Sequence, residues 1–181
     1  MADFVHLTNK TEYSLSEGAL PIARIAELCQ SFSMPAVGIS DNNNMFGALE
    51  FSEQIAKVGV QPILGCNIKI KTPKEYLHEN IEDNDLYFYL NIFSKNNEGY
   101  ENLLKCVSNA YTFNKGNAYV TVDDLIKFKD GLIILSGGNN SILTHSTGHM
   151  ITKQSQQFIS DFKKEFYDNF YIEIQRFGSV D

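Results

Sequence analysis

Short apolar runs alternate with amphipathic segments along the whole chain, and this alternation is the feature that most restricts the fold. The apolar runs read as strands at 4–7, 36–39, 61–70, 86–93, 132–135 and 170–174. The segments with helical spacing of apolar residues are 21–32, 44–58, 97–111 and 151–166. Strands separated by helices predict an α/β fold built on a parallel sheet or a (βα) barrel. The polar stretch 71–85 is expected to be a surface hairpin or loop, and residues 1–181 a single domain.

Composition narrows the functional classes. Fifteen Lys and Arg residues against 22 Asp and Glu give a net charge of -7, so the overall field disfavours binding of duplex DNA. The three cysteines are isolated and lack a CxxC pair, which predicts buried, reduced thiols. The first residues do not resemble a signal peptide, and no apolar run reaches the ~18 residues of a membrane span. We therefore expect a cytoplasmic protein without a membrane partner.

The segments that follow the strands carry few groups capable of catalysis. In a (βα) barrel the reactive side chains lie beyond the carboxyl ends of the strands. At those places the chain has amides, hydroxyls and one lysine, and its acidic donors are Glu12, Glu17 and Asp41. Phosphate-loop, GxSxG and HExxH motifs are absent from the sequence. His6 is interpreted as a core residue, while His145 and His149, four residues apart, are either solvated or a weak metal pair.

Six segments occur in the order and with the sequences of one known family. They are 4–18, 34–48, 61–66, 94–103, 131–137 and 170–176. Together they resemble the polymerase-and-histidinol-phosphatase (PHP) domain at the amino terminus of bacterial replicative polymerases, the DNA polymerase III alpha subunits. The resemblance implies a distorted, TIM-like (βα)7 barrel, which is expected to be incomplete because the chain stops at Asp181.

Metal-binding members of this family hold a trinuclear site of His, Asp or Glu, and Cys ligands. The resemblance places seven of the ligand positions at Thr8, Lys10, Glu17, Asn42, Asn67, Tyr89 and Gly138. Only Glu17 keeps a residue type that binds divalent metals. This comparison predicts a degenerate, metal-free pseudo-active site, with no cofactor and no catalytic residue in the chain. Lys10 is expected to neutralise Glu17 or Asp41 in the cleft, the alternative being a solvated lysine at the rim.

The resemblance also implies a biological setting. The parent polypeptide would be a DNA-directed DNA polymerase, a nucleotidyltransferase whose Mg²⁺ ions and DNA contacts lie outside this chain. We expect the domain itself to be a scaffold and docking module for the proofreading exonuclease subunit and other polymerase III holoenzyme subunits. Two alternatives remain, a residual metal-dependent phosphoesterase or 3′-5′ exonuclease, and a purely structural brace. The small basic clusters at Lys69, Lys71 and Lys74 and at Lys163 and Lys164 are either solvated or a minor DNA contact.

Overall fold

The structure is a computed structural model that describes residues 4–77, 87–113, 117–138, 141–145 and 152–175. Its strands are β1 (Ala36–Asn42), β2 (Gln61–Lys71), β3 (Tyr87–Ser94), β4 (Leu132–Leu135) and β5 (Phe170–Tyr171). Its helices are α1 (Ile22–Ser31), α2 (Ala48–Lys57), α3 (Asn97–Phe113), α4 (Val122–Lys127), α5 (Ile142–His145) and α6 (Lys153–Phe166). Two single turns of 3₁₀-helix, η1 (Lys74–Tyr76) and η3 (Tyr167–Asn169), complete the set.

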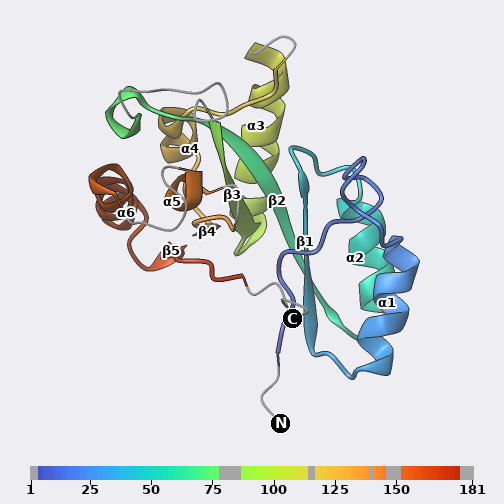
Figure 1. Cartoon of the computed structure of the whole chain (residues 1–181). Helices are drawn as coiled ribbons and strands as arrows, with labels where there is room; N and C mark the ends of the chain where they lie inside the picture. Colours follow the sequence, from blue (N-terminus) through green and yellow to red (C-terminus); the bar gives the residue numbers. More distant parts are fainter. Residues whose placement is uncertain (1–3, 78–86, 114–116, 139–140, 146–151, 176–181) are drawn as a thin grey trace.

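The five strands form one sheet in the order β1-β2-β3-β4-β5, so chain neighbours are also neighbours in space (Figure 1). The α/β class is therefore confirmed. The expectation of a purely parallel sheet is wrong, because β3 runs antiparallel to both β2 and β4. Of the stretch 71–85, expected to be a surface hairpin or loop, only residues 71–77 are described, and residues 78–86 lie outside the described residues. Within the described residues the sheet remains open, with β1 and β5 at its edges.

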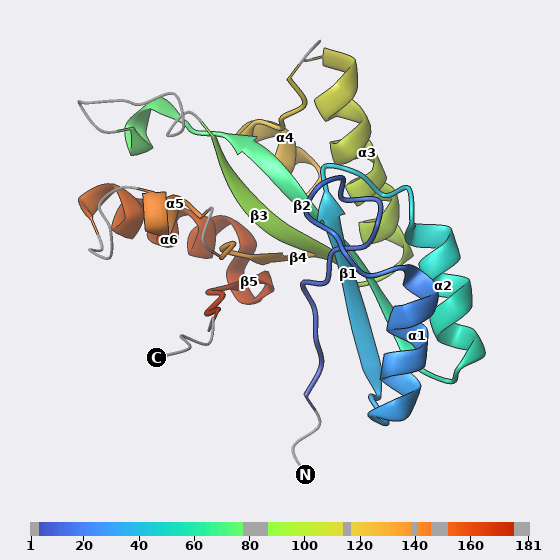
Figure 2. The ribbon, with the colours of Figure 1, turned by 45° about the vertical axis from the view of Figure 1, so that its right-hand side comes forward.

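Three local expectations need correction. Residues 4–7 do not form a strand, although the segment 4–10 runs beside β1 (Figure 2). The carbonyls of His6 and Asn9 in this segment accept two amide hydrogen bonds from β1. The last expected strand is only two residues long, and its extended continuation to Gln175 forms no ladder. The helix α4 was missed because six residues are too few to show a periodic apolar stripe.

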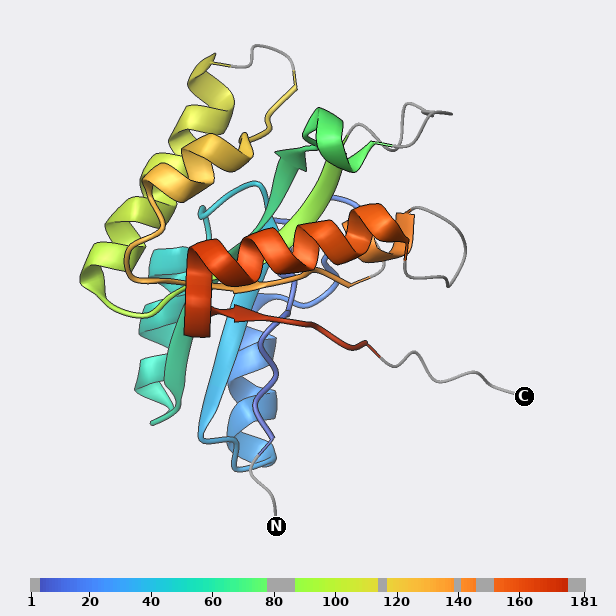
Figure 3. The same ribbon diagram turned by 90° about the vertical axis from the view of Figure 1, so that its left-hand side faces the viewer.

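Two apolar clusters hold the layers together. The first packs α1 and α2 onto β1 and includes Ile22, Phe51 and Ile55, all fully buried. The second joins the other four strands to α3, α4 and α6, which lies along β4 and β5 in Figure 3. Phe158 on α6 contacts Phe88 on β3 with ring centroids 5.4 Å apart. Burying one such side chain stabilises the fold by about 1.5–3 kcal/mol.

The helices cover one face of β2 and β3. Alternate residues of both strands point to the opposite face, and most of these are polar. That face carries Asn67, Lys69 and Lys71 from β2 and Tyr87, Tyr89 and Asn91 from β3, each β2 residue facing its β3 partner in register. This polar face, together with the segment 8–18, is where the candidate site lies.

Candidate functional site

A single carboxylate fixes the segment 8–18 against the end of β1. Asp41 is 1% exposed and accepts hydrogen bonds at Oδ1 from the Thr11 amide (2.7 Å) and the Ser14 hydroxyl (2.5 Å). Its Oδ2 accepts a third from the Thr11 hydroxyl, also at 2.7 Å. The Ser14 hydroxyl in turn accepts the amide proton of Asn42 at 3.1 Å. Asp41 is thus committed to holding the backbone and does not face the cleft as an open ligand.

Lys10 and Glu17 form an ion pair across this segment, through Lys10 Nζ and Glu17 Oε2. Hydrogen bonding from Lys10 and, to a smaller extent, from Asn42 holds the pKa of Glu17 below its ordinary value of 4.5. The expected partnership between Lys10 and one of the two cleft carboxylates is confirmed for Glu17. It does not involve Asp41, whose oxygens are taken by Thr11 and Ser14.

Tyr89 and Asn67 approach the same region from the sheet. Burial, followed by the negative charge of Glu17, raises the pKa of the Tyr89 phenol. Asn67 lies opposite Asn42 in the β1–β2 register. Because β3 is antiparallel, Tyr89 comes to this edge of the sheet near the amino end of its strand, whereas Asn42 stands at the carboxyl end of β1. The rule that site residues follow the carboxyl ends of strands therefore fails for β3.

A second polar cluster on the same face was not anticipated. Asn91 Oδ1 accepts hydrogen bonds from Ser40 Oγ (2.6 Å) and Asn67 Nδ2 (2.8 Å). Asn91 Nδ2 donates to Glu173 Oε2 at 2.7 Å, and the Glu173 amide donates to Ser136 Oγ at 3.0 Å. One side-chain amide thus links β1, β2, β3 and the segment after β5. The available signal was the alternation of Glu173 and Gln175 in the final apolar run, which places both on one face.

The remaining two positions that the resemblance assigns to metal ligands lie at the margins. Gly138 follows β4, and a Cβ there would lie 2.0 Å from Gln175 Oε1, so the Gln175 side chain occupies the space that a cysteine would need. Thr8 is half-buried in the segment beside β1.

Of the seven positions, the structure brings four together around one carboxylate. Lys10 and Asn42 hydrogen-bond to Glu17, and the charge of Glu17 acts on Tyr89.

The cysteines do not contribute reactive groups. All three are buried and free, as expected from the sequence. Burial raises the pKa of the Cys66 thiol, and it raises that of Cys106 to about 12. Thiols buried in this neutral form are chemically inert.

A family model for the PHP domain matches residues 6–177, which is most of the chain. This chain belongs to the PHP domain family. It is 30% identical to DNA polymerase III subunit alpha of Haemophilus influenzae over 180 residues and 33% identical to that of Caulobacter vibrioides over 181 residues. Each alignment covers 97% of this chain but only 14% and 15% of the relative, so the PHP domain described here matches a small part of those proteins.

Solved structures support the fold of this PHP domain. A protein of Bifidobacterium adolescentis assigned as a metal-dependent phosphoesterase superposes with a TM-score of 0.60 at 11% identity, covering 96% of this chain and 77% of that one. An amidohydrolase of Chromobacterium violaceum gives a TM-score of 0.57 at 10% identity, over 93% and 75% of the two chains. At these identities the likeness concerns the fold only.

The donor set of this PHP domain is poor in metal ligands. Among the residues that the structure describes, no three His, Cys, Asp or Glu side chains come close enough together to hold a metal ion. The Oδ1 atom of Asn42 is buried without a hydrogen-bond partner, and it is a neutral oxygen beside the Lys10–Glu17 pair. An amide, a phenol, an ammonium and one paired carboxylate can bind and orient polar groups, but they do not provide the charge that a cluster of divalent cations requires.

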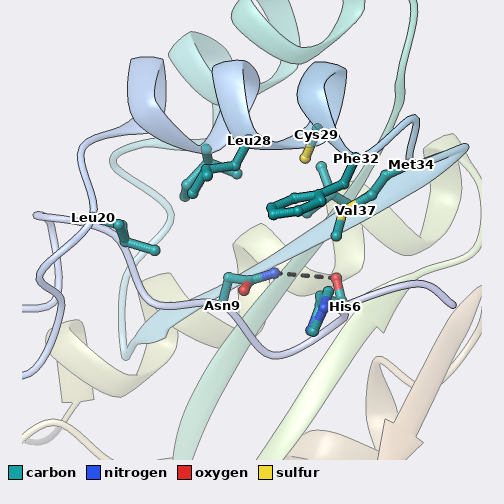
Figure 4. Close-up of a pocket in the computed structure, with 9 residues that line it drawn as sticks. His6, Asn9, Leu20, Leu28, Cys29, Phe32, Met34 and Val37 are labelled. Atoms are coloured by element: carbon teal, nitrogen blue, oxygen red, sulfur yellow. Dashed lines mark hydrogen bonds between the residues drawn. The ribbon is translucent and has the colours of Figure 1, made fainter.

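The histidine expectations have mixed outcomes. His6 is not a core residue: it is exposed and lies at the rim of an apolar pocket of about 180 Å³ between α1, β1 and the first segment. Figure 4 shows its carbonyl accepting a hydrogen bond from Asn9 Nδ2 (3.1 Å), with Leu28, Phe32 and Met34 across the pocket. His149 lies outside the described residues, so the His145–His149 pair is not described. None of the described helices has the length and apolar content needed to cross a membrane.

Proposed function

We propose that this PHP domain is a metal-free scaffold within a DNA polymerase III alpha subunit and that it serves to dock the proofreading exonuclease subunit. The observation that supports the first part most directly is the ion pair between Lys10 and Glu17, at two positions that are metal ligands in metal-binding relatives. A tethered ammonium takes the place of the cation that would otherwise balance the carboxylate.

The charges explain why a metal cluster does not fit these residues. Two unit charges about 4 Å apart interact by about 4 kcal/mol at an effective dielectric of ~20. A divalent ion beside Glu17 would experience twice that repulsion from Lys10, reduced by the partial exposure of both side chains. Nor do the remaining neighbours, Asn42, Asn67 and Tyr89, supply the negative charge to offset it. We therefore assign no catalytic step to this chain.

In this proposal the polar side chains have a structural role. Asp41 anchors the segment 8–18, and Asn91 ties three strands to Glu173. Both arrangements hold the segment 8–18 and the neighbouring strands in place through hydrogen bonds between side chains and backbone. Polymerase activity, its Mg²⁺ ions and the DNA contacts of the parent protein would belong to the part of the relatives that this chain does not match. The setting would be the cytoplasmic replication machinery.

Metal analysis combined with an activity assay tests the metal-free assignment. The purified chain is incubated with Mn²⁺ or Zn²⁺, desalted and analysed by mass spectrometry for bound metal, and its turnover of a generic phosphomonoester is measured. We expect well below one ion per chain and no turnover above a buffer blank. Retention of about three ions, or turnover that Glu17→Ala abolishes, would establish the phosphoesterase alternative.

Docking requires a separate experiment with the full-length polymerase subunit. We expect the exonuclease subunit to co-purify with the intact polypeptide. We expect this co-purification to be lost when residues 1–181 are deleted. Undiminished co-purification after the deletion would show that the domain is a brace and not a docking module. The melting temperature of the deleted protein is the control, because a collapse of the remaining chain would also abolish binding.

A further inference from the structure

Two lysines and two tyrosines form a surface beyond the candidate site, where β2 and β3 extend past the end of β1 (Figure 1). Lys69 Nζ lies 4.2 Å from the centroid of the Tyr87 ring, and Lys71 Nζ lies 5.5 Å from that of Tyr119. The two rings are 5.4 Å apart and inclined at 48°. We call these four residues the lysine–tyrosine surface. Each ammonium rests on an aromatic face, an attraction that holds its position without neutralising its charge.

The positive charge of this surface has no acidic partner in the described residues. Lys69 Nζ donates to the neutral Oδ1 of Asn117 at 2.9 Å, and Asn117 Nδ2 donates to the Tyr87 hydroxyl at 2.9 Å. Neither Lys69 nor Lys71 forms an ion pair with a described carboxylate. Uncompensated cations are notable in a chain of net charge -7, because carboxylates are abundant elsewhere.

A polar hollow of about 300 Å³ adjoins the surface and shares Lys71 with it. Lys74 also lines the hollow, as does Thr72, whose side chain is 7% exposed and makes no hydrogen bond to a described residue. The carboxylates of Glu75 and Asp123 lie at the same hollow, so an anion would be favoured only at its lysine end. Space is therefore available beside Lys71, together with a hydroxyl that makes no hydrogen bond to a described residue.

The surface is continuous with the candidate site. Lys69 lies opposite Tyr89 in the β2–β3 register, and its amide donates to Asn43 Oδ1 at 2.7 Å. Asn67, two residues before Lys69, points to the same face. An extended ligand bound to the lysine–tyrosine surface could therefore continue along β2 and β3 to the candidate site at Lys10 and Glu17.

We propose that the lysine–tyrosine surface binds single-stranded nucleic acid, an inference that does not depend on the proposed function. Cations that contact phosphates, combined with aromatic rings that contact bases, are the combination used for single strands without sequence preference. Lys69 and Lys71 are two residues apart on a strand, about 6.6 Å, so successive phosphates of an extended single strand can reach both. Duplex DNA is disfavoured by the overall negative charge of the chain.

The test is a binding titration with the 181-residue chain and a fluorescent oligothymidylate of about 16 nucleotides, the upper end of the site size of single-strand-binding folds. Anisotropy is followed over a range of salt concentrations. The variant Lys69→Gln with Lys71→Gln removes two charges and keeps a polar side chain that is one atom shorter. The matched control, Lys57→Gln with Lys153→Gln, removes two exposed charges, one on α2 and one on α6.

We expect the wild-type chain to bind at low salt and the surface variant to bind about tenfold more weakly. The slope of log Kd against log salt should fall by about 1.4, since each contact to a single strand contributes about 0.7. The control should retain the wild-type affinity and slope. If the double variant does not show the wild-type melting curve, Lys71→Gln alone is used, because that side chain is exposed.

Three results would overturn the inference. They are failure of the wild-type chain to bind at low salt, equal weakening by the two double variants, and displacement of the oligonucleotide by polyglutamate of the same charge. The last result would identify a surface for acidic protein segments instead. Retained binding by a Tyr119→Leu variant would remove the aromatic part of the argument and would count against the inference as well.

Discussion

Asp41 is the residue on which the position of the segment 8–18 depends, because one buried carboxylate accepts two hydroxyl protons and one amide proton. In Asp41→Asn the new NH₂ group would face one of these donors and leave it unsatisfied. Hydrogen bonds to charged groups contribute about 1.5–3 kcal/mol each, so we expect unfolding in urea to require about 2–4 kcal/mol less free energy. Glu53→Gln, an exposed acid on α2, is the control and should change stability by less than ~0.5 kcal/mol. Wild-type stability in Asp41→Asn would contradict this role.

The Lys10–Glu17 pair predicts a pH dependence of stability with a definite sign. Since the folded state lowers the pKa of Glu17, its contribution is present above the ordinary value of 4.5 and is lost as pH falls through the lowered value. Both side chains are partly exposed, so the contribution is at most about 1 kcal/mol. In Lys10→Gln the carboxyl pKa, followed by NMR, should rise towards 4.5, while Arg24→Gln should leave it unchanged. An unaltered Glu17 titration in Lys10→Gln would show that the pair is electrostatically unimportant.

Single residues also show how far the sequence alone reaches into the site. The partnership of Lys10 with a cleft carboxylate followed from charge balance, but the choice of Glu17 over Asp41 did not. That choice depends on Thr11 and Ser14, whose hydroxyls fold back onto Asp41. Asn91 was missed because the family resemblance points to Tyr89 alone on β3, and an amide in the middle of an apolar strand carries no signal of its own.

At the scale of elements, the segment 4–10 lies against β1 because Gly38 has no side chain. A Cβ on Gly38 would lie 2.4 Å from the Leu7 carbonyl oxygen and 2.8 Å from Leu7 Cα, both backbone atoms. Gly38→Ala should therefore displace the segment, cost about 1–3 kcal/mol and disrupt the Lys10–Glu17 pair, which is measured by the return of the Glu17 pKa towards 4.5. Gly47→Ala, which would meet only side-chain atoms of Tyr13 and Ile22, should have a smaller effect. Equal effects of the two substitutions would refute the close approach at Gly38.

Element type was more predictable than element direction. The helices α1, α2, α3 and α6 appear where apolar residues recur with helical spacing, because each buries one stripe on the sheet. The reversal of β3 has one signature in the sequence, the stretch 71–85 without a helical stripe, because a parallel neighbour needs a crossover that is usually a helix. The segment 4–7 has a strand-like composition, but the approach of its backbone to β1 is too irregular for a ladder.

For the molecule as a whole, the open sheet leaves β5 with no further strand on its outer side among the described residues. Ile172 and Ile174 beyond it are 49% and 85% exposed. Exposed apolar edges pair with other chains, so we expect concentration-dependent self-association in sedimentation velocity. Ile172→Lys with Ile174→Lys should shift the chain towards monomer, whereas Leu15→Lys with Leu49→Lys, an equal change at other exposed sites, should not. A chain that is monomeric at all concentrations would exclude an adhesive edge.

The salt link between Lys10 and Glu17 has a consequence for how this domain depends on its surroundings. The occupancy of an ion site depends on the free concentration of the ion and on its affinity, whereas a counter-charge attached to the same polypeptide is present in every molecule. Thermal unfolding should accordingly give one melting temperature in excess chelator and in excess zinc. A rise with zinc would reveal hidden ligands. The Lys10 ammonium that balances Glu17 is part of the polypeptide, so it is present whatever the supply of trace metals.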